Sequence, residues 1–119
     1  MTLRRRNKPE PRNDLLQGTL DMLVLQTLRL GDAHGYTIAR VIEQRSDAFL
    51  QVEQGSLYPA LNRLEDRGWV ASYWATSENN RRARYYRLTP KGRRQLDHEM
   101  EQWRQLVRAI GLVLKPIED

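Results

Sequence analysis

The sequence predicts a single, mainly helical domain that carries one β-hairpin, and three observations lead to this fold class. Four stretches have apolar residues at intervals of three and four, the spacing that places them on one face of a helix. Glycine, proline or short polar segments separate these stretches. Two short runs rich in aromatic residues, 69–74 and 83–88, flank a polar turn, as the strands of a hairpin do.

Length and composition indicate one soluble domain that shares apolar surface with another molecule. The chain has 119 residues, of which only 39% are hydrophobic, a low share for a self-contained globule. It contains no cysteine, which excludes disulfides and thiolate metal sites. No apolar run approaches the ~18–20 residues that cross a bilayer, and the basic N-terminus lacks the apolar segment of a signal peptide. We therefore expect a cytoplasmic protein with no membrane partner.

Positive charge is concentrated in two segments of the chain, whose net charge is +5. Residues 1–13 contain five basic side chains and one acidic one, and residues 75–95 contain seven and one. This asymmetry favours a polyanionic partner. Residues 1–13 also hold two prolines and little apolar surface, so we expect a disordered basic arm. For this arm, solvated charge without a partner is an equally good explanation.

The first two helices follow from apolar periodicity and its boundaries. Asp14 is a good N-cap, and the apolar pattern after it ends at Gly31, which predicts a helix over about 15–30. Residues 31–35 then form a tight connector, and a shorter helix covers about 35–46. Each helix has one apolar face, so both are expected to pack on a shared core.

We expect the third helix to run from Gly55-Ser56 to about Arg67. Ser56 can cap it, and Pro59 then falls in its first turn, where a missing N–H is tolerated. Its apolar side, which should face the core, consists of Leu57, Ala60, Leu61 and Leu64. Its opposite side carries Ser56, Tyr58, Pro59, Asn62, Arg63 and Asp66.

The last helix carries a second kind of apolar pattern. It should begin at Thr89-Pro90, a cap followed by a proline at the first helical position, and end near Leu114. Apolar residues alternate at intervals of four and three, a heptad seam formed by Leu96, Met100, Trp103, Val107, Ile110 and Leu114. The rest of the chain already makes a small core, so we expect this seam to pair with a second chain. The alternative is that it folds back on the chain's own first helix.

Helix, helix, helix, hairpin is the element order of a winged helix-turn-helix, in which the third helix enters the major groove of DNA. Asn62 and Arg63 can reach base edges, and Ser56 and Tyr58 can bind phosphate at the N-terminus of the helix. The hairpin is then the wing, and it brings its arginines to the duplex backbone or the minor groove. These arginines are Arg81, Arg82 and Arg84, close to the tip at Asn79-Asn80.

Each of these contacts has a plainer alternative. Arg63 could pair with Glu65 or Asp66, Tyr58 could pack on the connector, and Asn62 could be ordinary surface. A winged helix can also serve as a protein-interaction module without DNA binding, but such a module would expose an apolar third helix and a wing without arginines. RNA binding by the same basic face is a further alternative.

Three runs of residues, in this order, are specific enough to indicate a family. They are His34-Gly35-Tyr36, the run Gly55-Ser56-Leu57-Tyr58-Pro59-Ala60-Leu61 with its continuation to Trp69, and Tyr85-Tyr86-Arg87-Leu88-Thr89-Pro90-Lys91-Gly92. They closely resemble the PadR family of bacterial transcriptional regulators, over roughly residues 14–112. The resemblance implies a winged-helix domain over 14–88 and a C-terminal dimerisation helix over 89–115, as in the short members of the family.

The resemblance also implies a mechanism. Members are usually repressors that bind palindromic operators, and some release DNA on binding a small molecule. By position, the DNA-facing residues are Tyr36, Ser56, Tyr58, Pro59, Asn62 and Arg63, with Arg81, Arg82 and Arg84 on the wing. The expected partners are therefore double-stranded DNA and a second copy of the chain. The basic arm is longer than the family core requires.

We expect that the protein is not an enzyme and binds no cofactor. His34 and His98 lie far apart in the sequence, and without cysteines they make a poor metal site. Ser56 has no nearby histidine to activate it, and the chain has no glycine-rich phosphate loop.

Trp103 suggests a site for a small-molecule effector. It lies in the middle of the seam, so two copies would approach each other in a dimer, and paired aromatic rings can sandwich a flat ligand. The alternative, which we favour, is that Trp103 is simply a core residue.

Overall fold

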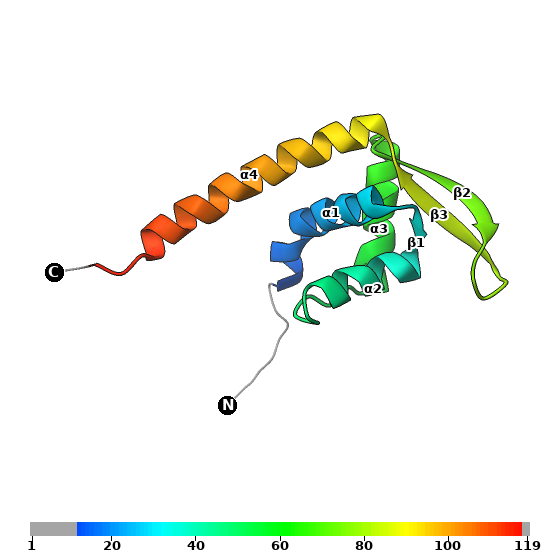
Figure 1. The fold of residues 1–119 in the computed structure, drawn as a ribbon, viewed down its shortest axis with the longest axis horizontal. Helices are drawn as coiled ribbons and strands as arrows, with labels where there is room; N and C mark the ends of the chain where they lie inside the picture. The colour runs from blue at the N-terminus through cyan, green and yellow to red at the C-terminus, as the bar shows by residue number, and fades with distance from the viewer. Residues whose placement is uncertain (1–11, 118–119) are drawn as a thin grey trace, which may run out of the picture.

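The computed structural model describes residues 12–117, and of residues 12–17 it describes the backbone alone. In chain order its elements are α1 (Arg12–Leu30), β1 (Ala33–His34), α2 (Gly35–Arg45), α3 (Gln54–Asp66), β2 (Val70–Thr76), β3 (Arg82–Leu88) and α4 (Pro90–Leu114) (Figure 1). This order confirms the mainly helical winged-helix fold. Within the described residues, no helix is both long enough and apolar enough to cross a membrane.

Helices α1, α2 and α3 enclose the core, and the first part of α4 closes it. The largest fully buried side chains come from all four helices: Val24, Leu25, Ile38, Leu57, Leu61, Leu64 and Leu96. The apolar face predicted for α3 is confirmed, because all four of its predicted core residues are at most 1% exposed. Their burial fixes which side of α3 is left for solvent or a partner.

The wing is the larger part of a three-stranded sheet with the order β1-β3-β2. Strands β2 and β3 pair antiparallel, with Trp74 opposite Arg84. Strand β1 joins the other edge of β3, with His34 opposite Tyr85. The sequence predicted only a connector at β1, because a strand of two residues is too short to show an alternating pattern.

Helix α1 begins earlier than predicted. It starts at Arg12, so Asp14 lies inside the helix and is not its cap. The periodic signal could not reveal this polar first turn, because it depends on apolar residues that begin after Asp14. Of the predicted basic arm, residues 1–11 lie outside the described residues.

Helix α3 also begins earlier, at Gln54. The carbonyl of Glu53 accepts hydrogen bonds from the backbone N–H groups of Ser56 and Leu57, so Ser56 is not the cap that the sequence predicted. Pro59 consequently lies in the second turn of the helix instead of the first. There its missing N–H leaves the carbonyl of Gly55 without its helical partner, and Gly55 is exposed to water.

The junction between the wing and α4 depends on Thr89 and Gly92. The predicted cap is confirmed, because the Thr89 hydroxyl accepts a hydrogen bond from the Gly92 N–H (3.0 Å) and donates one to the Gly68 carbonyl (2.7 Å). The Thr89 N–H donates to the Trp69 carbonyl. A Cβ added to Gly92 would lie 2.0 Å from that carbonyl oxygen. Only glycine allows α4 to start this close to the backbone of Trp69, the residue before β2.

The apolar seam predicted for α4 is buried in its first part and exposed in its second. Leu96 is fully buried and Met100 packs against the chain's own core, while an ion pair between Arg29 and Asp97 (3.1 Å) joins α1 to α4. Leu96 therefore has no surface left for a second chain, which corrects its assignment to a dimer interface. The second half of α4 extends beyond α1 (Figure 1), and the remaining seam residues are exposed: Trp103, Val107, Ile110 and Leu114.

The Gly92→Ala variant is expected to lower the free energy of unfolding by about 3 kcal/mol, because the added methyl group collides with backbone and the junction must open. The melting temperature should then fall by roughly 10 °C or more, which calorimetry or circular dichroism can measure. Gly55→Ala is the control, since nothing lies within 4 Å of its Cβ position. Equal melting temperatures for the two variants would contradict the close approach.

Candidate nucleic-acid interface

Helix α3 presents a polar face on the side opposite its buried leucines. Tyr58, Pro59 and Asn62 are exposed, and Ser56 is half-buried. The side chain of Asn62 forms no hydrogen bond with residues 18–117, so its amide is free to meet a partner. An amide of this kind can make two hydrogen bonds to the edge of an adenine.

Arg63 is engaged inside the chain. Its Nη2 atom lies 2.9 Å from Oδ1 of Asp21, an ion pair that joins α3 to α1. The sequence suggested Glu65 or Asp66 as alternative partners, and neither is the one observed. A partner on another helix leaves no local spacing signal, because the two residues are brought together only by the packing of α1 on α3.

Tyr58 holds the start of α2 against α3. A Cβ added to Gly35 would lie 2.8 Å from the Tyr58 hydroxyl oxygen, so the ring packs directly on the Gly35 backbone. The side chain nevertheless remains 43% exposed. Tyr58 thus packs at the end of the connector and still has an exposed edge. Packing on the connector and contact with a phosphate, the two roles predicted for it, are therefore compatible.

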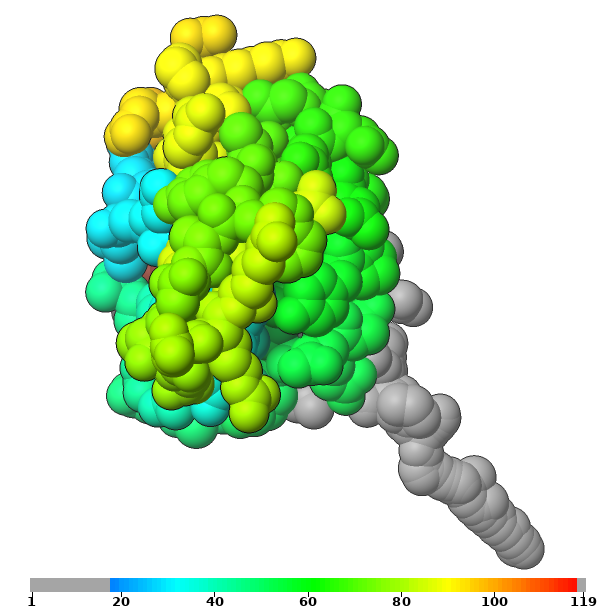
Figure 2. Space-filling model, turned by 90° about the vertical axis from the view of Figure 1, so that its right-hand side faces the viewer, coloured from blue at the N-terminus to red at the C-terminus, as the bar shows by residue number. Residues whose placement is uncertain are grey.

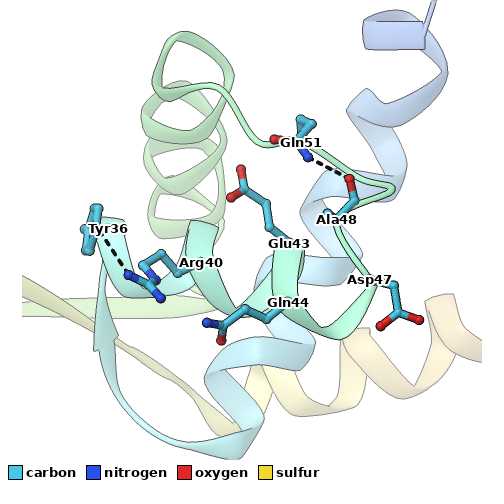
Figure 3. A pocket seen from close by; sticks show the side chains of 7 residues that line it. All are labelled: Tyr36, Arg40, Glu43, Gln44, Asp47, Ala48 and Gln51. Atoms are coloured by element: carbon cyan, nitrogen blue, oxygen red, sulfur yellow. Dashed lines mark hydrogen bonds between the residues drawn. The ribbon is translucent and has the colours of Figure 1, made fainter.

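Tyr36 and Arg40 extend this surface along α2 (Figure 3). Tyr36 is 59% exposed, and its hydroxyl accepts a hydrogen bond of 3.3 Å from Arg40. This bond raises the pKa of Arg40 further above its ordinary value. Tyr36 and Arg40 line one side of a shallow hollow of about 570 Å³ between α2 and the connector to α3. Arg40 was not among the residues predicted from the sequence, although its position one helical turn after Tyr36 is the signal that could have indicated it.

One face of the wing adjoins α3. Trp74, Arg82 and Arg84 share this face, because Trp74 lies directly opposite Arg84 and one diagonal step from Arg82. Glu65 of α3 contacts it, accepting hydrogen bonds from Arg84 (3.2 Å) and from the Ser72 hydroxyl (2.6 Å). Figure 2 shows the two strands crossing this side of the molecule beside α3. We call these three residues the cationic wing face.

The other face of the wing is aromatic. The rings of Tyr73 and Tyr85 stack at 5.7 Å, and His34 of β1 meets Tyr85 edge-on. The Tyr73 hydroxyl donates a hydrogen bond of 2.7 Å to Asp32, which raises the pKa of Tyr73 above its ordinary value. These contacts fasten the wing to β1 and the residue before it. The sequence did not anticipate them, because it did not predict β1.

A second hollow, of about 520 Å³, lies between α1 and α4. Asp21, His98 and Glu99 contribute polar groups to it, and Trp103 and Leu106 contribute apolar surface. His98 is here and His34 is at the wing, so the structure does not bring the two histidines together. No cluster of three metal-ligating residues occurs among the residues that the structure describes.

Comparison with known proteins identifies the family. A model of the transcriptional regulator PadR-like family matches residues 24–98, which include α2, α3, the wing and the start of α4. The chain belongs to the PadR-like family of transcriptional regulators. As a member of this family, it is a DNA-binding transcriptional regulator with a winged helix, as the sequence predicted.

Solved structures share this PadR-like fold over nearly the whole chain. A transcriptional regulator from Clostridium thermocellum is 32% identical, with a TM-score of 0.78, and the match covers 86% of this chain and 99% of that one. A PadR family transcriptional regulator from Eggerthella lenta is 36% identical, with a TM-score of 0.73, covering 87% and 88% of the two chains. An uncharacterized protein X from Lysinibacillus sphaericus is 27% identical over 107 residues, covering 90% of this chain and 98% of that protein.

Proposed function

We propose that this PadR-like protein is a homodimeric repressor that reads a palindromic operator with α3 and the wing of each subunit. The observation that carries the proposal is the junction of two surfaces: the exposed polar face of α3 continues into the cationic wing face, and Glu65 joins them. A duplex with its major groove on α3 would meet Arg81 and Arg82 of the wing at its backbone. Occupying a promoter in this way would block transcription in the cytoplasm.

The exposure of each residue, and its pairing within the chain, indicate which part of the DNA it would contact. Asn62 has an exposed amide on the outward side of α3, unpaired within residues 18–117, and would contact base edges. Ser56, Tyr58 and Pro59 flank it and would contact the backbone, as would Tyr36 on α2. Arg63 would reach a base only after leaving Asp21, so we assign it a smaller share of the readout.

The exposed half of α4 supports the homodimer. Trp103, Val107 and Ile110 are 45–49% exposed, and Leu114 is 74% exposed. A contiguous apolar stripe of this kind is rare on a monomer unless it binds a partner. A second copy offers the same heptad seam. A two-fold axis through this seam would present two recognition helices to two half-sites, about 34–36 Å apart if they share one face of the duplex.

Asn62→Ala is expected to weaken binding to the specific operator by about 10- to 100-fold, because the bidentate contact to a base is lost. Binding to random duplex should not change, since charge is conserved. Fluorescence anisotropy with the DNA upstream of the protein's own gene, or with a selected operator, measures both. Gln105→Ala, an exposed amide on α4, is the control.

The outcomes separate the alternatives. If the variant loses affinity equally for operator and random duplex, Asn62 does not read bases. If the unmodified protein binds no duplex even at low salt, the DNA-binding proposal fails and a protein-interaction module replaces it. Equal competition by RNA would favour RNA as the partner.

The double variant Val107→Glu/Ile110→Glu is expected to be a monomer at concentrations at which the unmodified protein is a dimer, because charges would be buried in the seam. Sedimentation velocity gives the mass directly. Gln105→Glu adds a charge on the opposite side of α4 and should leave the dimer intact. A dimer that survives the double variant would place the interface elsewhere.

Trp103 is where a small-molecule effector would bind. This side chain is half-exposed at the hollow between α1 and α4, where an aromatic ligand could stack on it. Planar aromatic compounds should then quench tryptophan fluorescence saturably, and Trp103→Phe should remove that quenching. Quenching that is absent, or that persists in Trp103→Phe, would exclude this site.

A further inference from the structure

The three wing arginines have different surroundings, although the sequence places them together. The Arg84 guanidinium lies 3.2 and 3.4 Å from the two carboxylate oxygens of Glu65. The Arg82 guanidinium carbon lies 5.0 Å from the centre of the Trp74 ring. Arg81 follows the turn, and its side chain has no partner among residues 18–117.

The surroundings of Arg84 remove it from DNA binding. Glu65 neutralises its charge, and the same carboxylate accepts a hydrogen bond of 2.6 Å from the Ser72 hydroxyl. If Arg84 turned to a phosphate, it would leave this carboxylate unpaired beside the duplex, where it would repel DNA. A neutral pair displaces no counterion from the duplex, so it adds nothing to the salt-dependent part of binding. Arg84 and Glu65 instead brace the wing against the recognition helix.

The surroundings of Arg82 prepare it for DNA binding. An aromatic ring attracts a guanidinium through its face but leaves the charge in place and the N–H edge open. A side chain already held in one orientation loses less conformational entropy when it binds. This pairing also accounts for Trp74, which is 56% exposed on the wing.

We propose that Trp74 is a positioning residue, which orients Arg82 so that it contacts a DNA phosphate. Glu65 instead pairs with Arg84, and this pair fixes the wing to α3. The inference rests on the proposed binding of duplex DNA. It assigns different roles to two arginines that are two residues apart on the same face of one strand. In this proposal Trp74 sets the orientation of Arg82, and Glu65 neutralises the charge of Arg84.

Salt dependence of binding tests this division in the full-length protein. Anisotropy with an operator duplex over a range of NaCl concentrations gives the slope of log K against log salt. Arg82→Ala should reduce the magnitude of this slope by about 0.9, the value for one phosphate contact. The charge-matched double variant Glu65→Gln/Arg84→Gln should keep the slope of the unmodified protein. The opposite pattern for these two proteins would overturn the assignment.

A double-mutant cycle tests the role of Trp74. Trp74→Leu should weaken binding by about two- to fivefold through loss of the cation–π contact, and Trp74→Phe should restore most of that loss. In the Arg82→Ala background, Trp74→Leu should have no further effect, whereas in the Arg81→Ala background its effect should persist. An equal effect of Trp74→Leu in both backgrounds would show that it acts independently of Arg82.

Circular dichroism of each variant separates loss of fold from loss of a contact. If the unmodified protein binds no duplex at any salt concentration, the DNA-binding proposal itself fails. If it binds but the slopes and the cycle do not follow the pattern above, only the assignment of Trp74 and Glu65 fails.

Discussion

Helix α3 is held by Leu57, Leu61 and Leu64, whose side chains are at most 1% exposed. Full burial of a leucine contributes about 1.5–3 kcal/mol, so this stripe sets the rotation of the helix about its own axis. The rotation in turn decides that Asn62 faces outward and that Glu65 faces the wing. The candidate interface is therefore a consequence of core packing, and a change in the stripe would move every outward residue of α3 together.

Ion pairs within the chain then reduce the number of basic side chains that are free to meet a partner. Asp21 engages Arg63 and Glu65 engages Arg84, so two of the basic residues that the sequence directs at DNA also fasten α3 to α1 and to the wing. A guanidinium in such a pair has less to offer a phosphate than a free one. The candidate binding surface consequently has fewer free positive charges than a count of its arginines indicates, and its geometry is held by these ion pairs.

Helix α4 carries one continuous apolar seam, of which one part is buried and the other is exposed. Its first turns are fixed by Thr89 and Gly92 and fill the core through Leu96. Its second half leaves the core and exposes the rest of the seam. The heptad pattern could not reveal where the buried part of the seam ends, because apolar residues that pack on the chain's own core and apolar residues that stay exposed have the same spacing and the same polarity.

The sequence by itself determined the order of the elements, the buried side of α3, the cap at Thr89 and the family. These features depend on local periodicity, capping chemistry and short motifs, all of which involve residues close together in the sequence. Only the tertiary structure decided that β1 joins the sheet, that Leu96 belongs to the core, and which arginines are already paired. The physical reason is that a two-residue strand, a burial boundary and an ion pair such as Arg63–Asp21 depend on residues brought together by folding from distant parts of the chain.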